Sequence, residues 1–226
     1  MKYQSILIVR LSAIGDVVHA LPVLDALREA FPEARLGWLV EELSAPLLEN
    51  HPYLDRVYVI PKKRWRKDFR GLWSSEIRPF FAGIKRDGWD ATLDLQGLSK
   101  SALGAWASGA RRRVGFAGPN AREVSWLLNN RRVRPLPADV HVVQQNLRLL
   151  EGLGVSLPER PPQGRLGIRD AERDAMRDKL RSSGWRGEPL LALNPGAGWV
   201  TKRWPPRYFA ELGTAIASEF GLRPII

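Results

Sequence analysis

Short apolar runs alternate with stretches of helical periodicity along most of the chain. Residues 6–9 form a continuous apolar run, which is typical of a parallel strand buried on both faces. Residues 16–30 place apolar side chains at helical spacing, and Pro22 predicts a kink or a second start within them. Further strands are predicted at 35–40, 56–60, 91–95, 114–116, 190–194 and 223–226. Further helices are predicted at 44–49, 78–86, 98–107, 141–153, 171–183 and 208–220. Such alternation predicts an α/β fold with a parallel sheet.

The pattern begins again after a proline-rich stretch, VSLPERPPQGR at 155–165, which is typical of a linker. We therefore predict an N-terminal domain over 1–160, a linker with a connecting helix over 161–185, and the start of a second α/β domain over 186–226. One or two parallel strands leave their edges without partners. We expect the chain to be a fragment that lacks most of this second domain.

The excess of positive charge is concentrated in one third of the chain. The net charge is +11, and residues 61–134 hold 17 Lys or Arg against 6 Asp or Glu. Such a concentration favours an anionic partner, such as nucleic acid, anionic lipid or a phosphorylated sugar lipid, although a solvated surface remains an equal alternative. Residues 62–76, basic and aromatic without periodicity, are predicted to be a loop. No nucleic-acid-binding motif occurs, so we predict no nucleic-acid partner.

Composition excludes several classes of protein. The chain has no cysteine, which excludes disulfide frameworks and thiolate metal sites and suits the cytoplasm. The histidines His19, His51 and His141 lack metal-ligand spacing, so no metal site is predicted. No window has the roughly 20 apolar residues of a transmembrane helix, and the run at 6–9 is too short for a signal peptide.

Three predicted strand-to-helix joints carry polar residues, and ligands of open parallel sheets bind at such joints. The joints are RLSAIGD at 10–16, LDLQGLSKS at 93–101 and NPGAGWVTKRWP at 194–205. None fits a dinucleotide fingerprint or a P-loop. Asp16 has two compatible interpretations: it caps a helix start, or it is an ionised carboxylate that takes a proton from a hydroxyl as general base.

The other two joints suggest binding rather than proton transfer. Gln96 and Lys100 are suited to sugar hydroxyls or a carboxylate, whereas Asp94 is predicted to be structural. Residues 196–202 combine two glycines, a hydroxyl and a cation, which suits a pyrophosphate and equally an ordinary turn.

Together with KRWRK at 63–67 and AREV at 121–124, these motifs resemble the lipopolysaccharide heptosyltransferases of glycosyltransferase family 9, most closely the heptosyltransferase I subgroup. The resemblance implies a GT-B fold of two Rossmann-like domains and an inverting, metal-independent transfer without a cofactor. It implies ADP-heptose as the donor, Kdo-lipid A as the acceptor, and a cytoplasmic enzyme that is peripheral at the inner membrane.

The resemblance also implies roles for single residues. Asp16 matches the general base of the family. The implied acceptor-binding residues are Arg64, Arg66, Lys67, Gln96, Lys100 and Arg122. The implied donor-binding residues are Gly15, Gly196, Gly198, Thr201 and Lys202. The later D-T-G-x-x-H motif of the family does not occur, so we expect this chain alone to be inactive. A sister inner-core heptosyltransferase and a non-catalytic module that binds anionic glycolipids remain alternatives.

Overall fold

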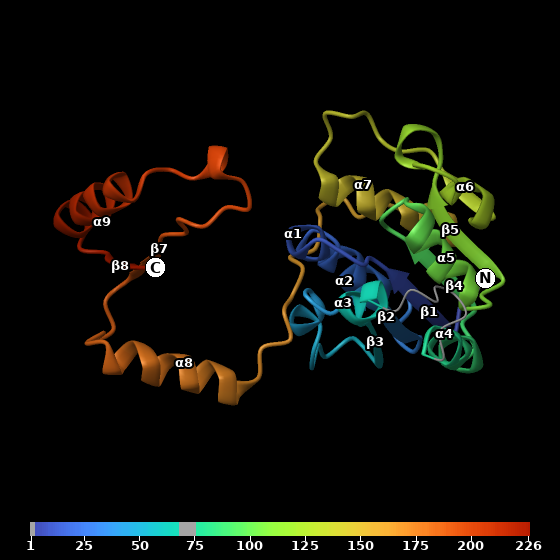
Figure 1. The fold of residues 1–226 in the computed structure, drawn as a ribbon, viewed down its shortest axis with the longest axis horizontal. Helices are drawn as coiled ribbons and strands as arrows, with labels where there is room; N and C mark the ends of the chain where they lie inside the picture. The colour runs from blue at the N-terminus through green and yellow to red at the C-terminus, as the bar shows by residue number, and fades with distance from the viewer. Residues whose placement is uncertain (1–2, 68–75) are drawn as a thin grey trace. The chain divides into compact units, whose positions relative to one another are not determined.

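The computed structural model describes residues 3–67 and 76–226, and these form two compact units (Figure 1). Unit 1 extends to Ile168 and unit 2 begins at Arg169. The linker stretch around Arg165 therefore belongs to unit 1. The predicted domain limits at 160 and 186 remain a prediction about how the chain is divided in function.

Unit 1 is built on a six-stranded parallel sheet in the order β3-β2-β1-β4-β5-β6. The strands are β1 Ser5–Val9, β2 Arg35–Glu41, β3 Arg56–Ile60, β4 Ala91–Asp94, β5 Arg112–Phe116 and β6 Arg131–Val133. Every residue of β1 is buried, as its continuous apolar run predicted. The direction of strand succession reverses between β1 and β4. A crevice at the carboxyl ends of these two strands is the ligand site that this topology provides.

Helices cover both faces of the sheet (Figure 1). On one face, the side chains of Ile6 and Ile8 pack against α1 (Ile14–Val18), α2 (Leu21–Ala30), α7 (Val142–Arg148) and the 3-10 helix η4 (Leu149–Leu153). On the other face, Leu7 and Val9 pack against α4 (Ile77–Arg86) and α5 (Ser99–Ala107). Two cores therefore hold β1 from both sides and fix the position of the loop that follows it. The predicted break at Pro22 is confirmed, since Pro22 lies in the first turn of α2.

The described residues 62–67 differ from the loop that was predicted over 62–76. Lys62–Lys67 forms a helix, α3, and residues 68–75 lie outside the described part of the chain. The rings of Phe80 and Phe81 on α4 lie 5.2 and 6.1 Å from the ring of Trp65. The local sequence pattern does not predict this aromatic contact, because its two sides are far apart in the chain. The contact holds α3 against α4 although the other residues of α3 are basic.

Several short elements complete unit 1. They are the 3-10 helices η1 (Ala45–Leu47) and η3 (Gly118–Asn120) and the helix α6 (Ser125–Leu128). The sequence analysis predicted neither α6 nor β6, because elements of four and three residues are too short to show a hydrophobic periodicity.

The end of unit 1 is a segment that is fastened to α2 and to the loop before β3. The backbone N–H of Gly164 donates to the carboxylate of Asp25 at 3.1 Å, and Nε2 of His51 lies 3.0 Å from the carbonyl oxygen of Arg165. The Arg165 guanidinium lies over the ring of Tyr53 and donates to its hydroxyl at 2.9 Å.

Unit 2 contains α8 (Asp170–Ser182), β7 (Leu190–Ala192), the 3-10 helix η5 (Val200–Lys202), α9 (Pro206–Phe220) and β8 (Arg223–Ile225). The strands β7 and β8 pair in parallel, which agrees with the predicted second α/β pattern. The guanidinium of Arg223 contacts the carboxylate of Glu188 at 2.9 Å and lowers the pKa of Glu188 to about 2.

Candidate active site

A cavity of about 550 Å³ lies at the carboxyl ends of β1, β4 and β5, where the topology provides a crevice. Its lining includes Arg10 and Asp16 from the end of β1 and the following turn, Gln96 from the loop after β4, and Arg122 from the segment after β5. Three of the residues that the sequence analysis selected, Asp16, Gln96 and Arg122, therefore share one cavity.

Asp16 is held by a buried arginine. The guanidinium Nη2 of Arg10 lies 2.9 Å from Oδ2 of Asp16, and its Nη1 donates to the carbonyl oxygen of Leu95 beyond β4. Arg10 is 9% exposed, whereas the Asp16 side chain is 45% exposed. The arginine thus connects the two loops at the strand reversal and leaves the carboxylate open to the cavity. Arg10 opens the RLSAIGD motif, so a cation beside Asp16 was visible in the sequence, although its role was missed.

The turn around Asp16 also explains its capping interpretation. Helix α1 begins at Ile14, two residues before the predicted start. Asp16 is the third helical residue, and its Oδ2 accepts the backbone N–H of Ala13 at 3.1 Å. This bond is the carboxylate half of a capping box, in which the side chain satisfies a donor before the first turn. The same contacts that stabilise the helix start orient the carboxylate, so the observed capping bond is compatible with the general-base interpretation of Asp16.

Asp94, the last residue of β4, and Gln96, in the loop that follows, have different structural roles. Asp94 is fully buried, and its carboxylate accepts from the backbone N–H groups of Gln96 and Gly97 and from Nδ2 of Asn129. Burial raises the pKa of Asp94 above its ordinary value, although these hydrogen bonds lower it in part. The Oε1 of Gln96 accepts the backbone N–H of Leu11 at 2.9 Å. Asp94 therefore shapes the turn, while Gln96 connects it to the loop that carries Asp16.

A loop that the sequence analysis did not select forms a wall of the cavity. Pro135, Leu136 and Ala138 line the cavity from the segment before α7. The buried amide of Gln145 accepts from the N–H of Leu136 and donates to the carbonyl oxygens of Leu136 and Pro137. One side chain therefore fixes this wall, and neither spacing nor charge indicates it in the sequence.

Lys100 lies beside the buried carboxylate of Glu41, which the sequence analysis did not select. Oε1 of Glu41 is 3.0 Å from Nζ of Lys100, and its Oε2 is 2.7 Å from Nζ of Lys62. Burial raises the pKa of Glu41, but hydrogen bonds and charges from the two lysines outweigh that effect, so its pKa lies below the ordinary value. Lys100 is thus part of a three-residue ionic cluster at the start of α5, rather than an isolated cation.

Arg64, a basic residue of α3 whose side chain the structure describes, does not line the cavity. Arg64 is exposed, and its Nε lies 2.8 Å from the carboxylate of Glu76. Arg66 and Lys67 belong to α3, and their side chains lie outside the described part of the structure. The predicted acceptor residues therefore divide into Gln96 and Arg122 at the cavity, Lys100 at the ionic cluster, and three residues on α3.

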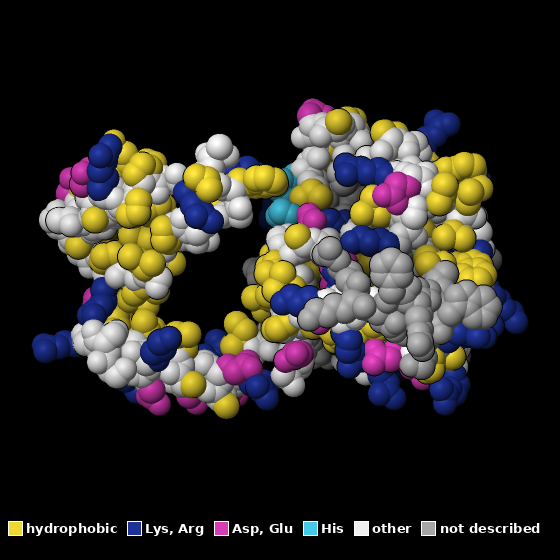
Figure 2. Space-filling model, viewed as in Figure 1, with side chains coloured by type: hydrophobic (Ala, Val, Ile, Leu, Met, Phe, Trp, Pro, Cys, Tyr) yellow, Lys and Arg dark blue, Asp and Glu magenta, His cyan; other side chains and the backbone are white. Residues whose placement is uncertain are grey.

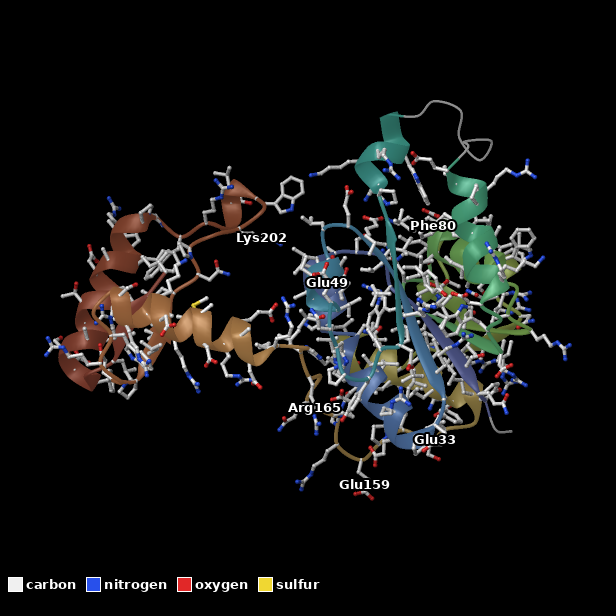
Figure 3. The ribbon with its side chains drawn as sticks, turned by 90° about the horizontal axis from the view of Figure 1, so that it is seen from below. Glu33, Glu49, Phe80, Glu159, Arg165 and Lys202 are labelled. Atoms are coloured by element: carbon white, nitrogen blue, oxygen red, sulfur yellow. The ribbon has the colours of Figure 1, made fainter. Side chains whose placement is uncertain are left out.

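The predicted donor residues lie in both units. Gly15 is in α1 beside Asp16, and an added Cβ there would meet no atom within 4 Å. The other four lie in the exposed loop that precedes α9 in unit 2. The backbone N–H of Gly196 donates to Oδ1 of Asn194 at 3.1 Å, which closes the start of this loop. Figure 3 shows Lys202 in η5, where its side chain lies at the surface of unit 2.

Among residues 3–67 and 76–226, no group of three or more His, Asp or Glu side chains has an arrangement that could hold a metal ion. Within the same ranges, no helix is both long enough and apolar enough to cross a membrane.

The doubly wound unit with its polar crevice, followed by the start of a second parallel unit, has the architecture of a GT-B glycosyltransferase. The family model described as "Glycosyltransferase family 9 (heptosyltransferase)" matches residues 77–223. The chain belongs to this family.

Relatives and solved structures agree with this assignment. Lipopolysaccharide heptosyltransferase 1 of Pseudomonas aeruginosa is 34% identical over 209 residues, which cover 92% of this chain and 56% of the relative. The core heptosyltransferase OpsX of Haemophilus influenzae is 31% identical over 98% of this chain and 59% of the relative. Escherichia coli heptosyltransferase WaaC with ADP-2-deoxy-2-fluoro heptose superposes with a TM-score of 0.74 at 29% identity, covering 97% of this chain and 67% of that chain. The chain thus spans a little over half the length of these curated relatives.

Proposed function

We propose that this chain provides the acceptor domain, and the first part of the donor domain, of a heptosyltransferase of the lipopolysaccharide inner core. The observation that carries the proposal is the Asp16 carboxylate, which is fixed by Arg10 and open to a cavity at the strand reversal. The likeness to heptosyltransferase 1 proteins supports it. We propose residues 1–160 as the acceptor domain, 161–185 as the connection and 186–226 as the start of the donor domain.

In this proposal, the acceptor is the Kdo of Kdo-lipid A. Kdo carries a carboxylate, and Arg122 and the amide of Gln96 lie in the same cavity as Asp16. An arginine is suited to a carboxylate because its N–H groups match the two oxygens. Lys100 and three of the basic residues of α3, Arg64, Arg66 and Lys67, would lie further along the anionic acceptor.

The donor in this proposal is ADP-heptose, and E. coli WaaC has been solved with ADP and with a fluorinated ADP-heptose. Gly196 and Gly198 permit close approach of the backbone to the diphosphate. Thr201 would donate a hydroxyl hydrogen bond to it, and Lys202 would offset its charge. Gly15 leaves space beside Asp16 for the sugar.

The reaction that these groups support is a single displacement with inversion. Asp16 takes the proton of an acceptor hydroxyl as that oxygen attacks the anomeric carbon of the heptose. The new C–O bond forms while the bond from the anomeric carbon to the phosphate oxygen breaks, and ADP leaves with the electron pair. The Lys202 ammonium stabilises the negative charge that develops on this leaving group. We place the enzyme in the cytoplasm, in peripheral contact with the inner membrane that contains its lipid acceptor.

The test is an Asp16→Asn substitution in the intact protein, with transfer of labelled heptose from ADP-heptose to Kdo-lipid A as the readout. Loss of a general base lowers turnover by about 10²–10⁴-fold. Binding of the acceptor saccharide should remain, because Asn keeps the shape of the side chain. The matched control is Glu33→Gln, which removes an exposed carboxylate before β2, outside the lining of the cavity, and should leave turnover unchanged. Wild-type turnover by Asp16→Asn would remove the general base from the mechanism. Transfer only to acceptors that already carry heptose would indicate a sister enzyme.

A further inference from the structure

Helices α4, α5 and α6 carry an exposed apolar surface that the candidate active site does not use. Trp106 on α5 is 54% exposed, and Trp126 and Leu127 on α6 are 44% and 61% exposed. Helix α5 contacts both α4 and α6, and a groove of about 570 Å³ between α4 and α5 is lined in part by Phe81, Leu103 and Trp106. Figure 2 shows hydrophobic side chains gathered along the edge of unit 1 where α5 and α6 lie.

A grouped set of exposed tryptophans needs an explanation, whereas scattered apolar side chains do not. On α5, Leu103 lies one helical turn before Trp106 and Ala107. These three side chains are on the side of the helix that faces away from the sheet. Tryptophan is enriched where one part of its ring contacts hydrocarbon and its N–H remains in a wet layer, as at the boundary of a lipid bilayer. The surface therefore has the side chains of an interfacial membrane contact.

Positive charges on α4 lie beside this surface, and the acidic residues at its edge have partners, among them Glu76, whose carboxylate lies 2.8 Å from Nε of Arg64. Helix α4 carries Arg78, Lys85 and Arg86 and contains no Asp or Glu. Arg78 and Lys85 line the same groove as the apolar side chains. The acidic Asp87 at the end of α4 accepts a hydrogen bond from the hydroxyl of Tyr58 on β3. Glu123, before α6, accepts the backbone N–H of Ser99 at 2.9 Å. Apolar side chains with adjacent cations complement an anionic bilayer, whose phosphates lie above its acyl chains.

The surface is continuous with the rim of the cavity. Arg122 lines the cavity, and its backbone N–H donates to the carbonyl oxygen of Gly97 at 2.9 Å. Val124 is 50% exposed, and its N–H lies 3.3 Å from Oγ of Ser99 at the start of α5. Trp126 follows two residues later. A molecule with an anionic sugar in the cavity and acyl chains in a bilayer would therefore extend along this segment.

We propose that the α4–α5–α6 surface docks on an anionic phospholipid bilayer. Trp106, Trp126 and Leu127 enter the interfacial layer, and Lys85 and Arg86 face the headgroup phosphates. The inference deepens the proposed function, since it would place the cavity at the membrane that contains a lipid-linked acceptor. The docking itself requires only phospholipid, so it is testable without donor or acceptor.

The experiment is co-sedimentation of the 226-residue chain with vesicles of phosphatidylcholine that contain a minor fraction of phosphatidylglycerol. Trp106→Ser combined with Trp126→Ser should reduce partitioning by about tenfold or more, because two large apolar side chains leave the interface. The matched control is Leu166→Ser combined with Ile168→Ser, whose side chains are 44% and 52% exposed. This control should partition like the wild type.

The charge contribution has its own measurement. Lys85→Ala should weaken binding to anionic vesicles about fivefold, which corresponds to about 1 kcal/mol for one cation near the surface. It should leave binding to pure phosphatidylcholine unchanged. Equal binding of the wild type to neutral and anionic vesicles would overturn the electrostatic part of the proposal.

Four further results distinguish a bilayer from a second copy of the chain, and the docking surface from the cavity. Wild-type partitioning by the double tryptophan variant overturns the proposal. A wild-type dimer that the same variant converts to a monomer in size-exclusion chromatography assigns the surface to a second copy and also overturns it. Retained binding of a lipid-free acidic saccharide by the variant shows that its cavity is intact and supports the proposal. If Arg122→Ala loses saccharide binding but keeps vesicle binding, the saccharide binds in the cavity and the bilayer binds at a separate surface, which supports the proposal.

Discussion

Replacement of Glu41 by glutamine should destabilise unit 1 by a modest and pH-dependent amount. Glu41 is 6% exposed, whereas the side chains of its partners Lys62 and Lys100 are 46% and 44% exposed. Hydrogen bonds to a charged group contribute about 1.5–3 kcal/mol each, but burial of the carboxylate costs several kcal/mol, which offsets part of this gain. Glutamine keeps the shape and one acceptor oxygen, and both lysines can return to water. The expected net loss is about 1–2 kcal/mol.

The assay is urea unfolding followed by near-ultraviolet circular dichroism, which reports mainly on the aromatic side chains packed in unit 1. A loss of this size lowers the midpoint by about 0.5–1 M for a typical urea slope of about 2 kcal/mol per molar. The matched control is Glu49→Gln, an exposed residue that Figure 3 labels on the same unit. Substitutions of this kind usually change stability by less than about 0.5 kcal/mol.

The direction of the pKa shift of Glu41 determines how the stability difference changes with pH. The pKa of Glu41 is lowered in the folded chain from an ordinary value of 4.5, so folding favours its ionised form. The stabilisation is therefore complete above the ordinary value and is lost as the pH falls through 4.5 toward the folded pKa. The difference in unfolding free energy between wild type and Glu41→Gln should be constant near neutral pH and should disappear in acid. A difference that persists unchanged to strongly acidic pH, or no difference at pH 7, would refute the reasoning.

Two further substitutions test the site and the core. Arg10→Lys keeps a buried cation but cannot bridge Asp16 and the loop after β4 together, so turnover in the intact protein should fall by about 10–100-fold while saccharide binding persists; unchanged turnover would show that the bridge does not position Asp16. Gly37→Ala should destabilise unit 1 by about 1–3 kcal/mol, because its Cβ would lie 2.4 Å from the ring of Trp89. Gly83→Ala, at a helical position with nothing within 4 Å, should instead stabilise it by up to about 1 kcal/mol, and the two thermal midpoints should move in opposite directions.

The sequence predicted the architecture well because the central strands β1, β2 and β4 are buried on both faces. A continuous apolar run such as 6–9, or the mostly apolar 36–40, needs no tertiary information to be recognised, and both became strands of the parallel sheet. The break at Pro22 followed from the missing N–H and the fixed backbone angle of proline. In contrast, α3 depends on contacts between Trp65 and the rings of α4, which lie more than a dozen residues away.

The candidate site was predicted in part, and its missing partners share a physical cause. Asp16, Gln96 and Arg122 were found because polar residues directly follow strands or belong to a recognised motif. The ion pair from Arg10 and the cluster around Glu41 were missed, because each joins segments far apart in the chain. Lys100 shows the consequence: the sequence analysis selected it as a binding residue, but its pairing with Glu41 depends on how α5 lies beside β2.

The bridge from Arg10 has a consequence for how such an enzyme changes its specificity. Arg10 directly follows β1, and its guanidinium donates to the carbonyl oxygen of Leu95 after β4. Its ion pair with Asp16 therefore fixes the position of that carboxylate relative to the two central strands. The wall formed by Pro135 and Leu136 is fixed separately, through Gln145 on α7. In the proposed function, the wall that would fit the sugar and the carboxylate that would take the proton thus have independent supports. Exchange of residues 134–140 should therefore leave the Arg10–Asp16 ion pair in place.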